Sequence, residues 1–587
     1  MKIKSSQFTH ILWITLAFAW LLAACKAAPQ RESKPSADWS RSVSVGNFVN
    51  GSIGIAVNGA GERVHLVWPA NVGEGTYLRY VQLDTQAQPV IEKNLEFPGI
   101  LRAPRLAAAG ENELHLFWGS RPPGGKMWAI WYARLGTGGE FSNAPVQISQ
   151  PEVGVGNYLV ASDHQGGVVL CWERDTSGEI YLQHLDQNGS PLSELVMLTS
   201  TGSSPAVWVN SDDNVYLAWQ QEGSVVFARA ALQDLSAGDV TAIGDIPQGT
   251  GLSFDGPYLG VAGDWAYVFW SVLNQSGLEA GTGYTAYTAF PVDAPANLKA
   301  NRLLLSPDEE QPYTAYEGSF HLTQLAPPAE AAWASTDFIL SPSVMQGSQT
   351  GELAMAVAMN QAMRLDQHLQ IAIGVFKDGQ FVGYTLGTKT ENISDDPVLF
   401  IDTLMNLHLA WREGAAGNSV FYATTQAQAS AALERLTAGD IINAIFQGGM
   451  EGLVGVAFLP VIGFGWLLPG MVVVGIVKFF RDQDNLVAWY HWIPLIFALL
   501  LYHVVKLATL PTIASYVPFS AWVDIPARVG EPLRVIVPLL IFVIAFLVAN
   551  RILQKKTQSA AVFYISFTLV DALLTLAIYG VNFLGVY

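Results

Sequence analysis

Cysteine is nearly absent from this chain, which has only Cys25 and Cys171 among its 587 residues. Two cysteines exclude a disulfide framework, and they also exclude a cysteine-based zinc site. The sequence lacks the HExxH motif of zinc proteases, a Walker loop, a GxSxG nucleophile elbow and a glycine-rich dinucleotide fingerprint. No motif therefore points to a common enzyme class, and we expect no cofactor and no metal.

Charged residues are scarce, and basic residues are the scarcer kind. Charged residues of both signs make up 14% of the chain, whereas they make up roughly 25% of soluble domains. There are 31 Lys and Arg against 49 Asp and Glu, a formal charge of −18. From Ala438 onward 7 acids face 8 bases, so the negative charge lies before that residue. Because phosphate binding needs clustered bases, we expect no nucleic-acid partner.

The first residues are typical of an export signal. A basic start precedes the apolar stretch Ile11–Ala24, which is too short for a spanning helix of ~20 residues but fits a signal-peptide core. The stretch ends in Leu22-Ala23-Ala24-Cys25, which resembles the lipobox of bacterial lipoproteins. The resemblance implies cleavage of residues 1–24, acylation of Cys25 and a tether over 25–41. The alternative is an ordinary signal peptide that contains a cysteine.

A repeat of about fifty residues follows. Each unit has a strand that ends in tryptophan and a second strand rich in Tyr or Phe; these tryptophans are Trp68, Trp118, Trp172, Trp219, Trp270 and Trp411. The spacings are 50, 54, 47, 51 and 141, and we interpret the last gap as two or three units without the tryptophan. One of them is Glu352–Met359 with Ile371–Thr385. The period predicts an all-β propeller of six or seven four-stranded blades over 42–426, with two β-sandwich domains as the alternative.

Aromatic residues recur within the units. We expect the tryptophans to be structural blade anchors. His65, His115 and His408 repeat one strand position, and Tyr216 and Tyr267 take it in two other units. These side chains could form a ring that stacks on a sugar or holds a metal, but we favour packing between neighbouring blades. Cys171 is interpreted as a buried small hydrophobe.

The units resemble the blades of bacterial sialidase-like and lectin-like propellers. Ser162-x-x-x-Gly166 and Ser211-Asp212-Asp213-Asn214 come near the sialidase Asp-box, Ser-x-Asp-x-Gly-x-x-Trp, although the unit tryptophans do not fall at its tryptophan position. The similarity covers nearly the whole segment, and it implies a role in glycan recognition. Sialidase-like enzymes also gather arginines from different blades, but Arg102, Arg105, Arg121 and Arg134 lie in one unit, and we interpret them as surface residues.

The C-terminal part predicts a membrane domain. An amphipathic connecting helix is expected over 427–452, followed by a transmembrane domain, 453–587, with four helices at about 453–477, 489–510, 535–553 and 560–586. The signal peptide places the propeller outside the cytoplasm. Basic residues at Lys478–Arg481 and Arg551–Lys556 then fall inside, as the positive-inside rule requires. We predict a multi-pass protein of the bacterial cytoplasmic membrane.

Asp571 lies near the middle of the last predicted span. Intramembrane carboxylates are candidates for proton or ion paths, but Asp571 could also be protonated and hydrogen-bonded to Thr568 or Thr575. The sequence places Lys506 and His503 nearer the outer surface.

Three functions are compatible with the sequence. The first is a membrane-anchored binding or sensing module for a glycan, peptide or envelope protein, or a scaffold of an envelope complex. The second is a glycoside hydrolase on the same propeller. The third is a transporter or channel component with an outer propeller cap. We favour binding over catalysis, and the sequence singles out no catalytic residue.

Overall fold

The computed structural model describes residues 38–584 except 48, 59–62, 73–74, 111, 151, 164, 176, 308–312, 364–365, 391, 415–418, 436–437, 482–485, 487–488, 511–517, 519–526 and 557–558. The predicted signal peptide, Cys25 and most of the tether therefore lie outside the described residues. The chain divides into two units: Glu32–Arg435 forms one, and the helices that follow Leu436 belong to the other.

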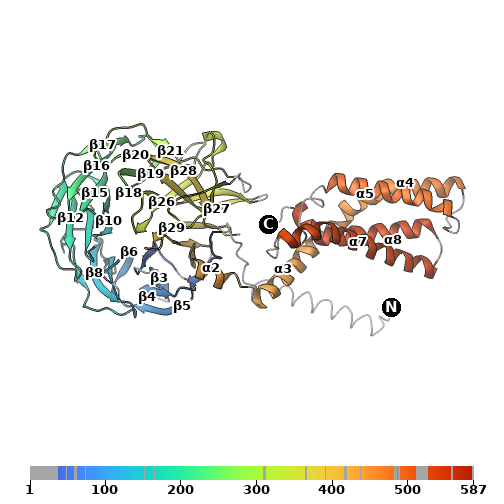
Figure 1. Ribbon diagram of the computed structural model, residues 1–587, viewed down its shortest axis with the longest axis horizontal. Helices are drawn as coiled ribbons and strands as arrows, with labels where there is room; N and C mark the ends of the chain where they lie inside the picture. The colour runs from blue at the N-terminus through green and yellow to red at the C-terminus, as the bar shows by residue number, and fades with distance from the viewer. Residues whose placement is uncertain are drawn as a thin grey trace. The chain divides into compact units, whose positions relative to one another are not determined.

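The first unit is a β-propeller, as the tryptophan period predicts, and its seven blades fall within the predicted six or seven (Figure 1). Four successive strands make each of the first five blades. Blade 1 contains β2 (Gly54–Val57), β3 (Val64–Val72), β4 (Gly75–Leu83) and β5 (Pro89–Leu95). Blade 2 contains β6 (Ile100–Ala108), β7 (Glu113–Arg121), β8 (Ala129–Gly136) and β9 (Val146–Gln147). Blade 3 contains β10 (Val155–Ser162), β11 (Val168–Arg174), β12 (Ile180–Leu185) and β13 (Val196–Thr199). Blade 4 contains β14 (Ser203–Val209), β15 (Asn214–Gln221), β16 (Ser224–Ala231) and β17 (Thr241–Asp245). Blade 5 contains β18 (Leu252–Ala262), β19 (Trp265–Asn274), β20 (Gly283–Pro291) and β21 (Asn301–Arg302).

The last two blades depart from this simple order. Blade 6 contains β24 (Ile339–Val344), β26 (Glu352–Met363), β27 (Asp366–Lys377) and β28 (Gln380–Leu386). Blade 7 contains β29 (Ser394–Ile401), β30 (Leu407–Glu413), β31 (Ser419–Thr424) and β1 (Val43–Gly46), with the short β25 (Gln346–Gly347) on its inner edge. The N-terminal strand is thus the outermost strand of the last blade. Its pairing with β31 closes the ring non-covalently.

The unit tryptophans lie on the second strand of six blades, and all of them are buried. In most of these blades the tryptophan sits opposite a β-bulge in the innermost strand; Trp118 faces the bulge between Arg102 and Arg105 in this way. In blade 6 the corresponding position is taken by Val357, opposite the bulge between Leu340 and Ser343. A smaller side chain at this one position removes blade 6 from the tryptophan period.

The prediction of two or three tryptophan-free units before Trp411 is wrong. The structure places one blade, blade 6, between blade 5 and blade 7. The remaining length is an insertion after β21 that contains the hairpin β22 (Thr314–Ala315) and β23 (Gln324–Leu325) and the short helix η1 (Ala332–Ala334). An insertion and a missing tryptophan together lengthen the gap as further blades would.

The innermost strands explain how the centre of the propeller is built. A proline follows the bulged residue in five of them, at Ala103-Pro104, Ser204-Pro205, Gly256-Pro257, Ser341-Pro342 and Asp396-Pro397, and the residue before each proline has a positive φ. Proline cannot donate to a strand ladder, so it is confined to edge strands and bulges. The inner edge of a blade is such a place.

The ring has two faces. We call the face on which the innermost strands begin the upper face and the face on which they end the lower face. Both ends of the unit are held at the lower face: Ser40 N donates to Thr424 O over 2.8 Å, and Ala429 of α2 (Ala427–Leu433) is buried against blade 1. Within the described residues, the chain therefore enters and leaves the propeller at the lower face.

The second unit is helical. Its elements are α3 (Ala438–Ala457), the π-helical turn η2 (Leu459–Gly463), α4 (Phe464–Arg481), η3 (Trp489–His491), α5 (Trp492–Thr509), α7 (Ala527–Lys556) and α8 (Ala560–Leu584). Four helical stretches are long and apolar enough to span a membrane: Leu459–Phe480, Trp492–Thr509, Pro532–Gln554 and Ala560–Gly580. Two helices, α2 and α3, stand where the sequence predicted one connecting helix. Glycines bring α3 against α8, because a Cβ on Gly455 would lie 2.1 Å from Leu576 O.

Candidate ligand-binding channel

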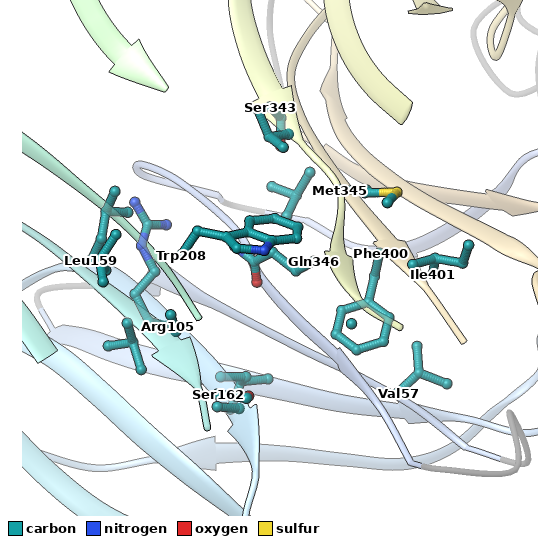
Figure 2. A pocket seen from close by; sticks show the side chains of 18 of the residues that line it. Val57, Arg105, Leu159, Ser162, Trp208, Ser343, Met345, Gln346, Phe400 and Ile401 are labelled. Carbon is teal, nitrogen blue, oxygen red and sulfur yellow. The ribbon is translucent and has the colours of Figure 1, made fainter. Parts of the chain in front are cut away.

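A cavity of about 680 Å³ runs along the axis of the propeller. The innermost strands of all seven blades contribute to its wall, from Val57 in blade 1 to Phe400 in blade 7. Figure 2 shows Arg105, Trp208 and Gln346 converging in this space, with Phe400 and Val57 across from Arg105. The volume lies within the range of about 300–1,000 Å³ that is usual for small-molecule sites.

Two carboxylates from different blades lie at the upper end of the cavity. Asp255 stands just before the bulge of β18 and accepts a hydrogen bond of 2.9 Å from the hydroxyl of Tyr258. Asp396 is the bulged residue of β29, with a φ of 47°. The bulges thus direct these acidic side chains toward the axis of the propeller. In a regular strand the same side chains would point toward a neighbouring blade.

Arg412 holds the acidic pair of blade 7. Its guanidinium bonds both oxygens of Asp395 over 2.8 Å and lies 2.9 Å from Asp396. The pKa of Asp396 is nevertheless raised, because burial disfavours the carboxylate, Arg412 offsets this only in part, and Asp395 and Asp255 add like charge. Burial and the neighbouring Asp255 also raise the pKa of Tyr258. Asp396 is therefore the carboxyl of this site best suited to carry a proton.

Arg105 is the unusual residue of the channel. Its guanidinium forms no hydrogen bond or ion pair with any described residue, although its Nε is buried. Arginine stays charged at any physiological pH, so an unpaired guanidinium inside a cavity is a site for an acceptor from a ligand. The indole N–H of the buried Trp208, which also lines the cavity, likewise has no partner among the described residues.

The other arginines of blade 2 are occupied. Arg102 donates to the carbonyl oxygens of Val155 and Gly156, and its guanidinium lies 4.1 Å from the ring centre of Trp128. Arg121 packs on the same ring, and Arg134 pairs with Glu113. The interpretation of all four arginines as surface residues is therefore wrong for Arg105, because the bulge of β6 turns this residue into the channel.

The recurrent histidines are structural. His65, His115 and His408 are buried, and each forms a hydrogen-bonded pair with a tyrosine of the third strand in its own blade: Tyr80 at 2.8 Å, Tyr132 at 3.0 Å and Tyr422 at 2.6 Å. The buried acids at the lower end are also satisfied, since Asp402 accepts from Leu404, Asn406 and His408. No group of three potential metal-ligating side chains was found within the described residues.

A polar cluster lies inside the helical unit. The Nζ of Lys506 on α5 is 2.5 Å from Oδ2 of Asp571 on α8, and the hydroxyl of Tyr502 donates to the same oxygen over 2.7 Å. No basic partner at the depth of Asp571 was expected from the sequence. In the structure Lys506 is that partner, because its long side chain reaches across to α8. Asp571 Oδ1 and the hydroxyl of Thr575 are buried without a partner in the described part of this unit.

The six unit tryptophans and Cys171 are buried, and none of these tryptophans lines the channel. The channel residues Arg105, Trp208, Asp255, Tyr258 and Asp396 were not selected from the sequence. The sequence feature that could have located them is the X-Pro pair that recurs in the innermost strands, because the channel residues lie close to these pairs. That step is a second repeat, out of phase with the tryptophans.

No family model and no curated protein sequence matches the chain. Solved structures similar to it include a polysaccharide lyase (9% identity, TM-score 0.40, covering 64% of this chain and 90% of the lyase). An α-L-arabinofuranosidase from Fusarium graminearum has 9% identity and a TM-score of 0.35, covering 66% and 98%; an α-L-arabinanase from Penicillium chrysogenum has 14% and 0.34, covering 55% and 92%. At these TM-scores the likeness assigns no residue and no reaction to this chain.

Proposed function

We propose that this protein binds a glycan in the central channel of its propeller and that its helices hold the propeller at a membrane. The observation that carries the proposal is the unpaired guanidinium of Arg105 inside the cavity. A charged hydrogen-bond donor without a partner inside a cavity is unfavourable, and a hydrogen-bond acceptor from a bound ligand would remove that cost.

The rest of the wall suits a sugar. Sugar hydroxyls both donate and accept hydrogen bonds, while the C–H faces of the ring are apolar. Asp255 and Asp396 would accept from hydroxyls, Arg105 would donate to them, and the side chains of Trp208 and Phe400 provide apolar wall. Few polar groups on a largely apolar wall are the usual composition of a small-molecule site.

The binding experiment uses the full chain in lipid nanodiscs on a glycan array. We expect at least one class of glycan to bind, and Arg105→Met to weaken that binding by tenfold or more. Arg302→Met is the matched control, because Arg302 is an exposed arginine of the outermost strand β21 that stacks on Tyr284. Unchanged binding by Arg105→Met, or no binding to any glycan, would overturn the proposal.

Glycoside hydrolysis is the second candidate, and one observation favours it. Asp396 has a raised pKa and lies within the electrostatic reach of Asp255 on another blade. Glycosidases use such a pair, one carboxyl to protonate the leaving oxygen and the other as nucleophile or base. If the protein is a hydrolase, it releases reducing sugar from a bound oligosaccharide, and Asp396→Asn and Asp255→Asn each abolish the release. If it is a binding module, the wild type releases none.

The membrane arrangement is part of the proposal. We place the propeller outside the cytoplasm, anchored by acylated Cys25 and by four spanning helices. The export signal and the basic residues at Lys478–Arg481 and Arg551–Lys556 support this orientation. Cys25→Ser should abolish labelling with palmitate, and a reporter after Tyr587 should act as extracytoplasmic while one after Gln558 acts as cytoplasmic. Normal labelling, or the reverse reporter pattern, would contradict these assignments.

A further inference from the structure

The charged side chains of the channel wall are unequally satisfied. Among the described residues that line the channel, Arg105 is the single base, and Asp255, Asp396 and Asp402 are the acids. Each of the three acids has a hydrogen bond or an ion pair with a side chain of the protein, as set out below. The guanidinium of Arg105 has none with any described residue.

The acids have their partners within the propeller. Asp255 accepts from the hydroxyl of Tyr258 over 2.9 Å, and Asp402 accepts from the backbone N–H of Leu404 over 2.8 Å. Asp396 lies 2.9 Å from the guanidinium of Arg412. The charges that act on Asp396 are those of Arg412, Asp395 and Asp255, so its counter-charge is Arg412 and not Arg105.

The groups around Arg105 do not satisfy it either. Two tyrosines, Tyr158 and Tyr258, lie within the electrostatic reach of its guanidinium. The hydroxyl of Tyr158 donates to Ala103 O, and that of Tyr258 donates to Asp255. Neither hydroxyl forms a hydrogen bond with Arg105, so the guanidinium keeps its donors for another molecule.

A second donor of the channel is also unused. The indole N–H of Trp208 on β14 is buried and has no partner among the described residues. Figure 2 shows Arg105 and Trp208 extending into the channel, the first from blade 2 and the second from blade 4. A guanidinium and an indole N–H donate hydrogen bonds and accept none. A ligand that satisfies both must therefore carry acceptors.

The charge of Arg105 distinguishes between kinds of acceptor. Any ligand that fills the channel displaces water from the guanidinium. A neutral sugar would leave the positive charge both desolvated and without a counter-charge, which is unfavourable. A carboxylate or a sulfate on the sugar supplies the counter-charge and several acceptor oxygens in one group. Hydrogen bonds from a guanidinium to such an anion are roughly twice as strong as those between neutral groups.

We propose that the glycan bound in the channel is acidic, and that its carboxylate or sulfate group pairs with Arg105. This inference rests on the proposed glycan-binding function and specifies the class of glycan. The propeller as a whole carries the negative charge of the chain, which has a formal charge of −18. Non-specific attraction would therefore work against an acidic glycan, and a preference for one has to come from a local group such as Arg105.

The test uses the full chain in nanodiscs of zwitterionic lipid on an array of matched oligosaccharides. Each uronic acid oligosaccharide is printed beside its methyl ester, which has nearly the same shape but no charge, and each sulfated oligosaccharide beside its desulfated form. We expect at least one acidic oligosaccharide to bind tenfold or more above its neutral partner. A preference confined to the uronic acids identifies the carboxylate, and one confined to the sulfated sugars identifies the sulfate.

Variants assign the preference to its residue. Arg105→Met should remove the difference between acidic and neutral partners, because the cation is lost. Arg105→Lys should keep part of it, since lysine retains the charge without the planar fork of donors. Arg302→Met, which removes an exposed arginine of β21, should keep all of it.

Equal binding of acidic and neutral partners would overturn the acidic ligand and leave glycan binding in place. A preference that persists in Arg105→Met would overturn the pairing with Arg105. Absence of binding to every glycan, acidic and neutral, would instead overturn the proposed function, and the acidic ligand with it. The failure of this inference is therefore distinguishable from the failure of the proposed function.

Discussion

Lys506 on α5 and Asp571 on α8 form a buried ion pair inside the helical unit, with 2.5 Å between Nζ and Oδ2. Tyr502, one turn before Lys506 on α5, donates to the same carboxylate oxygen. Removing one partner of a buried pair leaves an uncompensated charge, whereas replacing both by apolar side chains is often tolerated. This asymmetry gives the first prediction.

Asp571→Asn should destabilise the helical unit strongly, by about 3–5 kcal/mol, because Lys506 stays buried without its counter-charge. The double variant Lys506→Met/Asp571→Leu should recover most of the loss. Thermal unfolding of the full chain in one detergent, followed by helical circular dichroism, measures both. A double variant that unfolds as early as Asp571→Asn would show that the pair is needed for more than charge balance.

Trp39→Ala should destabilise the propeller by about 3–5 kcal/mol, because the indole of Trp39 is fully buried in the largest core cluster and its loss leaves a cavity. Trp333→Ala is the matched control, since Trp333 is 87% exposed on η1 and its loss should change stability by less than about 0.5 kcal/mol. The unfolding midpoint of the propeller, followed by tryptophan fluorescence, distinguishes the two. Equal midpoints for both variants would contradict the placement of Trp39.

Gly347→Ala should disturb the segment Met345–Thr350, which joins β24 to β26 and pairs with blade 7, because the added Cβ meets Ile401 O and the backbone of Gly347 has a positive φ. Gly351→Ala, only four positions away, should have little effect because no atom lies within 4 Å of its Cβ. Limited proteolysis of the full chain should yield a new cleavage near residues 345–350 in Gly347→Ala alone. The same cleavage pattern in both variants would show that the close approach of Gly347 to Ile401 does not hold this segment in place.

His65 should make the propeller sensitive to acid. Burial, with a smaller contribution from Arg63, lowers the pKa of His65 to about 4 from its usual 6.5. The unfolded chain therefore binds this proton first, so stability is complete above about pH 6.5 and falls as the pH drops toward 4. The full shift is worth up to about 3 kcal/mol. His65→Phe should unfold at a midpoint that falls less steeply over this range; a parallel fall would exclude His65 as a source.

The tryptophan period was sufficient to predict a propeller, because each tryptophan packs at the same place in its blade. Blade 6 could not be counted from the sequence, since Val357 takes the tryptophan position and an insertion separates it from blade 5. The channel residues could not be selected either. Whether Arg105 points to the axis or to a neighbouring blade is decided by a bulge, and a bulge depends on register and not on residue type.

The seam between the first and last blades has a consequence for synthesis. Ser40 and Thr424, which bond each other at the seam, are 384 positions apart in the chain. β1 has therefore been made long before β31 exists, and blade 7 can gain its outer strand only when nearly all of the propeller has left the ribosome. Until then the edge strand of an incomplete ring is exposed to other chains, and a polypeptide that stops before Ser419 keeps that exposed edge permanently.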